Sequence, residues 1–179
     1  MSERSLPMPP AVQARLWQEA GDMPAYAILD GAQNPRLLDA LYADHAPRWR
    51  CLFTGQLEPD MAVVAPYLVE LEPSAAFARR LLAEGWGQNW GVFLTSQLAL
   101  PALWRHVRQQ VHVYGPNLES LFFRFYDPRV MRNYLPTCPP EQIADFFGPV
   151  DFYIAEAEEP ARAHAWSLAN GKLVAQGLR

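Results

Sequence analysis

The sequence has few of the features that mark secreted and membrane-bound proteins. It contains two cysteines, Cys51 and Cys138, which are too few for a disulfide framework. No apolar run approaches the roughly 18 residues of a membrane span. The first ten residues contain three prolines and no apolar core of a signal peptide. We therefore expect a cytoplasmic protein.

Concentrated positive charge is also missing. The 179 residues include 15 Lys and Arg against 19 Asp and Glu, which gives a formal net charge of −4 at pH 7. Phosphate backbones are bound by a basic footprint, but the basic residues here are scattered and form no run that would attract an anionic membrane. We expect neither a nucleic-acid nor a membrane partner.

Patterns typical of catalytic, metal and cofactor sites are absent from the sequence. The four histidines have no HExxH or paired Cys/His spacing, and there is no GxSxG nucleophile elbow. The Gly-rich segment 85–91 leaves a predicted helix and enters a strand, the reverse of a dinucleotide-binding loop. We predict a non-enzyme without metal or cofactor. The alternative is a small hydrolase or transferase that uses Cys138 or a histidine with Asp127.

What the sequence does have is enough apolar material for one domain with a substantial core. Hydrophobic residues make up 50% of the chain and aromatic residues 12%. The 17 prolines lie mostly between periodic segments, so we interpret them as the boundaries of many short elements.

The periodic segments predict alternating strands and helices. Apolar runs predict strands at 25–29, 50–53, 90–95, 111–114, 121–126, 152–155, 163–169 and 173–178. Helical spacing predicts helices that begin near residues 11, 34, 73, 101, 128 and 140. Pro66 marks an edge, a bulge or a strand start, and Asn170-Gly171 predicts a hairpin. The expected fold is α/β: a mixed sheet flanked by short helices, with a C-terminal β-hairpin.

The segment 121–149 organises this pattern. Residues 121–126 carry bulk on both alternating faces, which predicts a central strand that is covered above and below. Asp127 is expected to cap a helix that Pro128 begins. A second short helix is expected to end at Gly148.

This segment carries a family resemblance. The block RFYDPR (124–129), followed by FFGP (146–149), resembles the signature of the type VI secretion effector chaperones, or adaptors, a family catalogued as a domain of unknown function. Three further blocks fit in the same order: YAILDG (26–31), APYLVEL (65–71) and WGVFLTS (90–96). The resemblance covers roughly residues 24–150.

The resemblance implies a function and a division of the chain. It implies a non-catalytic chaperone or adaptor that binds one cognate secreted effector, a toxin, and helps to mount it on the spike protein. The expected parts are an N-terminal tail and helix (1–23), the effector-chaperone domain (24–150) and C-terminal strands with a hairpin (151–179). Family members often continue into a larger helical lobe, whereas strands are expected here. Apolar and aromatic residues exposed on one patch would supply the binding energy.

The RFYDPR block also supplies the candidate site residues, which are Arg124, Tyr126, Asp127, Arg129 and, just beyond it, Arg132. One interpretation is structural: an ion pair and a helix cap fix a strand-to-helix corner. Asp127 is the nearest partner for Arg124, and if the cap occupies it the alternatives are Asp30, Glu70 and Asp151. The other interpretation is a partner-contact surface that includes Arg129, Arg132 and Tyr126.

An acidic run follows the strand predicted at 152–155. Glu156, Glu158 and Glu159 are expected to lie in a solvated loop. The alternative is a charged docking surface for a basic partner.

Overall fold

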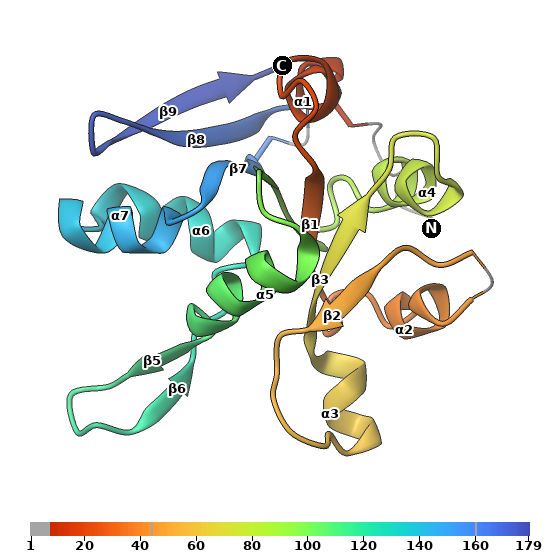
Figure 1. The fold of residues 1–179 in the computed structure, drawn as a ribbon, viewed down its shortest axis with the longest axis horizontal. Helices are drawn as coiled ribbons and strands as arrows, with labels where there is room; N and C mark the ends of the chain where they lie inside the picture. Colours follow the sequence, from red (N-terminus) through yellow and green to blue (C-terminus); the bar gives the residue numbers. More distant parts are fainter. Residues whose placement is uncertain (1–7, 44, 160) are drawn as a thin grey trace.

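The computed structural model describes residues 8–43, 45–159 and 161–179. Its strands are β1 (Ala25–Asp30), β2 (Trp49–Cys51), β3 (Pro66–Leu71), β4 (Gly91–Ser96), β5 (His112–Tyr114), β6 (Ser120–Phe122), β7 (Val150–Glu156), β8 (Ala163–Ala169) and β9 (Lys172–Leu178). Seven of them form one sheet in the order β2-β3-β1-β4-β7-β8-β9, and β5 and β6 form a separate hairpin (Figure 1). Every pairing given for these strands is antiparallel.

Short helices lie between the strands. They are α1 (Pro10–Gln13), α2 (Leu37–Leu41), α3 (Pro59–Val64), α4 (Ala76–Glu84), α5 (Leu100–Gln109), α6 (Pro128–Tyr134) and α7 (Pro140–Phe147). A π-helical turn (Ala14–Gln18) continues α1, and a 3-10 turn (Leu135–Thr137) follows α6. Five of the helices have proline in the first turn, where its missing N–H and fixed φ cost nothing.

The helices cover both faces of the sheet. Helices α1, α2 and α4 contribute buried residues to the core on one face, and α5, α6 and α7 contribute to the core on the other. Figure 1 shows α5, α6 and α7 to the left of the central strands and α2 and α4 to their right. The central strand β1 is buried along its whole length because both of its faces are covered.

Side-chain alternation explains the two cores. In β1, Ala25, Ala27 and Leu29 lie in one core, whereas Tyr26 and Ile28 lie in the other. Successive residues of a strand point to opposite faces. The same six-residue strand therefore contributes to both layers.

The expected fold class is confirmed: a sheet carries short helices on both faces and ends in a hairpin. Pro66 is the first residue of β3, one of the three positions predicted for it. Asn170 and Gly171 join β8 to β9, with φ of 52° and 73°. Positive φ at both turn residues is what a two-residue hairpin requires. The predicted N-terminal tail falls mostly outside the described residues, but Met8 is buried in the core.

The central strand predicted at residues 121–126 is wrong. Strand β6 ends at Phe122 and, among the described strands, pairs with β5 alone, whereas the central strands of the sheet are β1 and β4. Phe125 and Tyr126 are both buried in the same core although they are adjacent. This is possible because the chain turns at these residues, which form no strand. The large side chains at alternating positions of residues 121–126 therefore reflect a turn that packs into the core and not a strand covered on both faces.

Helix α3 was not anticipated from the sequence, in which its apolar residues run on into β3. All six of its residues are at least partly exposed, so no buried stripe reveals it. Over the residues that the structure describes, none of the helices has the length and apolar character needed to cross a bilayer.

We predict that replacing Phe146 by alanine strongly destabilises the fold. Its side chain is 2% exposed and its ring lies 5.2 Å from that of Tyr153 and 5.3 Å from that of Phe125. The cavity should lower the free energy of unfolding by about 3–5 kcal/mol, measured by urea denaturation. Phe122→Ala, at a ring that is 57% exposed, should cost less than about 1 kcal/mol. Equal losses in the two variants would contradict this packing.

Candidate functional site

The corner at the start of α6 holds most of the predicted site residues. Asp127 is the N-cap of α6, because its carboxylate accepts the backbone N–H of Arg129 at 2.9 Å. Pro128 takes the first helical position, where it needs no hydrogen-bond acceptor. The predicted cap is confirmed.

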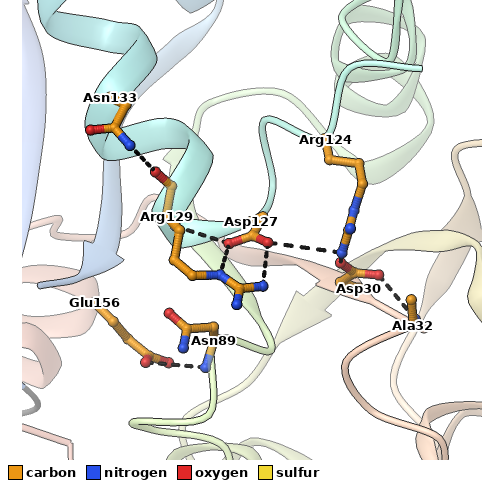
Figure 2. A network of polar contacts seen from close by, with 8 residues as sticks. All are labelled: Asp30, Ala32, Asn89, Arg124, Asp127, Arg129, Asn133 and Glu156. Atoms are coloured by element: carbon orange, nitrogen blue, oxygen red, sulfur yellow. Dashed lines mark hydrogen bonds and ion pairs between the residues drawn. The ribbon is translucent and has the colours of Figure 1, made fainter. Parts of the chain in front are cut away.

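The Arg129 side chain closes on the same carboxylate. Its Nε donates to Oδ1 of Asp127 at 2.9 Å and its Nη2 donates to Oδ2 at 2.7 Å. Two parallel bonds of this kind are the strongest arrangement for a guanidinium and a carboxylate. Asn133, one helical turn further on, donates its side-chain amide to the backbone C=O of Arg129 at 3.0 Å (Figure 2).

Arg124 joins this corner to the end of β1. Its Nη2 donates to Oδ2 of Asp30 and lies 3.8 Å from Oδ2 of Asp127. Asp30 is fully buried, and its other carboxylate oxygen accepts the N–H of Ala32 at 2.9 Å. Figure 2 shows Arg124 above Asp30, with Asp127 between the two arginines. Of the partners left open for Arg124, Asp30 is the main one.

The charges at the corner support one another. Burial works against ionisation of Asp127, but the hydrogen bonds and charges of Arg129, together with the charge of Arg124, outweigh it and hold the Asp127 pKa below its ordinary value. The hydrogen bond to Asp30 raises the pKa of Arg124. Burial, followed by the charge of Asp30, raises the pKa of Tyr126. The Asp127 carboxylate is therefore ionised and the Tyr126 hydroxyl is neutral at pH 7.

The five predicted residues do not share one surface. Tyr126 and Asp127 are buried, so solvent reaches the corner mainly at the guanidinium groups of Arg124 and Arg129. Arg132 points elsewhere and donates to the backbone C=O of Glu156 at 2.7 Å. If this block contacts a partner, the exposed arginine side chains make the contact.

The solvated loop expected for the acidic run is wrong for Glu156. This residue is the last of β7 and is buried, whereas Glu158 and Glu159 are exposed. Its Oε2 accepts the backbone N–H of Asn89 at 3.2 Å (Figure 2). Burial raises the pKa of Glu156 to about 7, against the lowering effect of its backbone hydrogen bonds and of Arg132. Strand β7 extends one residue beyond the C-terminal end of the predicted strand 152–155, and no local pattern indicates this extension.

The residues of the alternative, enzymatic hypothesis lie in unfavourable surroundings for that chemistry. Burial raises the pKa of the Cys138 thiol, and its hydrogen-bond partner is Tyr134. A nucleophilic cysteine needs a lowered pKa. Asp127 is held by two arginines, and His106 donates from Nε2 to the backbone C=O of Phe146 at 3.0 Å. Within the described ranges no three His, Cys, Asp or Glu residues are grouped so that they could hold a metal ion.

A second feature, not predicted as such, lies beside the corner. The β5–β6 hairpin projects from the body of the molecule (Figure 1). It carries five large exposed apolar side chains, which we call the hairpin surface: Val113, Tyr114, Leu118, Leu121 and Phe122. Tyr114 is 74% exposed and Leu118 82%. Exposed apolar groups gathered on one element mark an interaction surface more often than scattered ones do.

The hairpin surface is fixed to the body at its base. Phe123 donates its N–H to the backbone C=O of Val111 at 2.7 Å. The Phe122 ring lies 4.8 Å from that of Phe53 and 5.0 Å from that of His112. Two strand-like runs on either side of residues 115–119 were the sequence signal for this hairpin. Exposure of its apolar residues could not be read from that signal.

Replacing Asp127 by asparagine should destabilise the protein in a pH-dependent way. Asparagine keeps an oxygen for the helix cap but loses the charge that Arg129 and Arg124 face. Because the Asp127 pKa is lowered on folding, its stabilisation is fully present above its ordinary pKa, about 3.9, and is lost as pH falls through its lower folded pKa. We expect a loss of about 1–3 kcal/mol at pH 7 that is smaller at pH 3 in urea titrations. A difference that is the same at both pH values would show that charge is not its cause.

Replacing Glu156 by glutamine should stabilise the protein at high pH, whereas the Asp127 replacement destabilises it. A carboxyl whose pKa is raised on folding costs stability as pH rises from its unfolded pKa, about 4.3, to its folded pKa, about 7. The variant should therefore match the wild type near pH 4 and exceed it at pH 8 by on the order of 2–3 kcal/mol. Glu158→Gln, at an exposed position, is the matched control and should show no such trend. A Glu156→Gln variant that is less stable at pH 8 would refute the burial cost.

Comparison with known proteins gives one match. No curated protein and no solved structure matches the chain. The model of the family described as "Domain of unknown function (DUF4123)" matches residues 25–145. This range contains the RFYDPR corner, the hairpin surface and four of the seven strands of the sheet. Since the match covers more than half of the chain, the protein belongs to the DUF4123 family, which is associated with type VI secretion effectors.

Proposed function

We propose that this protein is a non-catalytic cytoplasmic chaperone or adaptor that binds a cognate type VI secretion effector and helps to load it onto the spike protein. The observation that carries the proposal is the family match over residues 25–145. A family associated with these effectors supports a role in handling them. The surroundings of Cys138 and Asp127, described above, lend no support to the enzymatic alternative.

The hairpin surface is the part of the protein best suited to an effector. It combines Tyr114 and Phe122 with three aliphatic side chains on one projecting element. Large aromatic residues supply much of the energy at protein interfaces. Water contact with these side chains is unfavourable in the free protein, and a partner that covers them recovers that free energy. We assign the effector to this surface.

The corner beneath the hairpin gives the surface a fixed position. Arg124 follows β6 by two residues and is bound to the buried carboxylate of Asp30. Asp127 starts α6 three residues later. A surface that is already ordered loses less conformational entropy when it binds. The structural role of the RFYDPR block thus supports binding by the element next to it.

The test is capture of effector or spike proteins by the tagged protein. We expect the purified chain to retain a large multidomain toxin, or the spike protein, among the products of its neighbouring genes. Tyr114→Asp and Phe122→Asp together should reduce this recovery by about tenfold or more, since a charge in an apolar interface is costly. The control is Val174→Asp, which places the same charge at an exposed apolar residue of β9.

The outcomes separate the role from the surface. Recovery of neither an effector nor a spike protein would overturn the proposed function. If the hairpin variant recovers as much effector or spike protein as the wild type, the proposed function is supported but the hairpin surface is excluded as the binding site. Circular dichroism should show equal melting temperatures for the variants, so that a loss of binding is not a loss of folding.

A further inference from the structure

Strand β2 forms one edge of the seven-stranded sheet and leaves backbone groups unpaired by the sheet. Among the described strands it pairs with β3 alone. On its inner side, the C=O of Arg48 accepts the N–H of Glu70 at 2.9 Å, and the N–H of Leu52 donates to Pro66 at 2.9 Å. Hydrogen bonding alternates along an antiparallel strand. The N–H and C=O groups of Trp49 and Cys51 therefore point away from β3.

A groove follows this outer edge. It has a volume of about 590 Å³ and lies between β2 and the first turns of α5. Trp49 and Cys51 form one wall, and Leu100, Pro101 and Trp104 form the other. An edge strand beside a helix is the setting in which several peptide-binding domains accept an additional strand.

The chemistry of the groove is aromatic and basic. The guanidinium carbon of Arg50 lies 5.3 Å from the centre of the Trp104 ring, and that of Arg108 lies 4.7 Å from it. The indole N–H of Trp104 donates to the backbone C=O of Cys51 at 2.7 Å, which fixes the ring that both arginines contact. Arg50 and Arg48 line the groove, and Arg48 pairs with Glu70 at 3.0 Å. Arg108 lies next to the groove, against the ring of Trp104. No carboxylate lies among the described residues that line it.

This positive groove stands out because the protein as a whole is acidic. The formal net charge is −4, so a long anionic partner such as nucleic acid would be repelled by most of the surface. A short acidic segment would meet only the local charge. The outward-pointing peptide groups of Trp49 and the N–H of Cys51 match a peptide backbone, which nucleic acid does not possess.

We infer that the groove between β2 and α5 binds an extended acidic segment of a partner protein, which adds to the sheet beside β2. The segment's backbone pairs with Trp49 and with the N–H of Cys51. Its carboxylates face Arg50 and Arg108, and its apolar side chains contact Trp104 and Pro101. This inference deepens the proposed function and rests on it only in taking the effector as the source of the segment.

The test uses a fluorescein-labelled synthetic peptide in which glutamate alternates with valine, followed by fluorescence anisotropy with the full chain. We expect saturable binding, and Arg50→Glu or Arg108→Glu should weaken it by about tenfold. Lys172→Glu is the matched control, because it makes the same charge change on β9 at the opposite edge of the sheet. It should change the affinity less than twofold.

Two further probes test the mode of binding. The same peptide with N-methyl groups at alternate residues cannot complete a strand ladder and should bind about tenfold more weakly. A peptide with lysine in place of glutamate should not bind. Single-stranded oligothymidylate is the nucleic-acid probe, and it should neither bind at physiological salt nor displace the acidic peptide.

The inference is overturned if the acidic peptide fails to bind, if both arginine variants bind it as well as the wild type, or if the oligonucleotide displaces it. Using two arginine variants keeps the test valid if one of them unfolds. The groove and the proposed function can fail separately. Peptide binding without effector capture would support the groove and contradict the proposed function. Effector capture that Arg50→Glu and Arg108→Glu leave unchanged would support the proposed function and exclude the groove as the effector site.

Discussion

The buried carboxylate of Asp30 is the constraint on which the corner of this structure depends. A charged group away from water must be paired and hydrogen-bonded. Asp30 meets this requirement by accepting from the N–H of Ala32 on one oxygen and from Arg124, 94 residues away in the chain, on the other. The pair joins the end of the central strand β1 to the segment between β6 and α6. The position of both the hairpin and α6 follows from that bond.

Each residue of the RFYDPR block has a structural task at this junction. Arg124 neutralises Asp30, while Phe125 and Tyr126 fill the core on one face of the sheet. Asp127 caps α6, and Arg129 closes on the capping carboxylate. A family signature of this kind describes how the domain is built. The surfaces that would meet a partner lie beside it, on the hairpin and along β2.

The sequence was informative wherever local chemistry decides the structure. Asp127-Pro128 and Asn170-Gly171 were predicted correctly, because a helix cap and a two-residue turn depend on a few adjacent residues. Residues 121–126 were misassigned because alternating bulk cannot distinguish a strand covered on two sides from a turn packed into a core. The Asp30 partner of Arg124 remained one alternative among several until the fold brought the two together. Exposure of the hairpin surface depends on what the rest of the chain leaves uncovered, so no local pattern could reveal it.

The hairpin surface and the β2 groove are connected through one short segment. Cys51 accepts the indole N–H of Trp104 at the groove, and Phe53, two residues later, packs against Phe122 at the base of the hairpin. The two surfaces also differ in chemistry, since one is apolar and the other basic. A partner that has an apolar face followed by an extended acidic segment could engage both, and the second contact would then be intramolecular. Such linked binding strengthens association well beyond either contact alone and is lost when the spacing is wrong. Discrimination between one cognate effector and others would then come from the spacing as well as from the contacts.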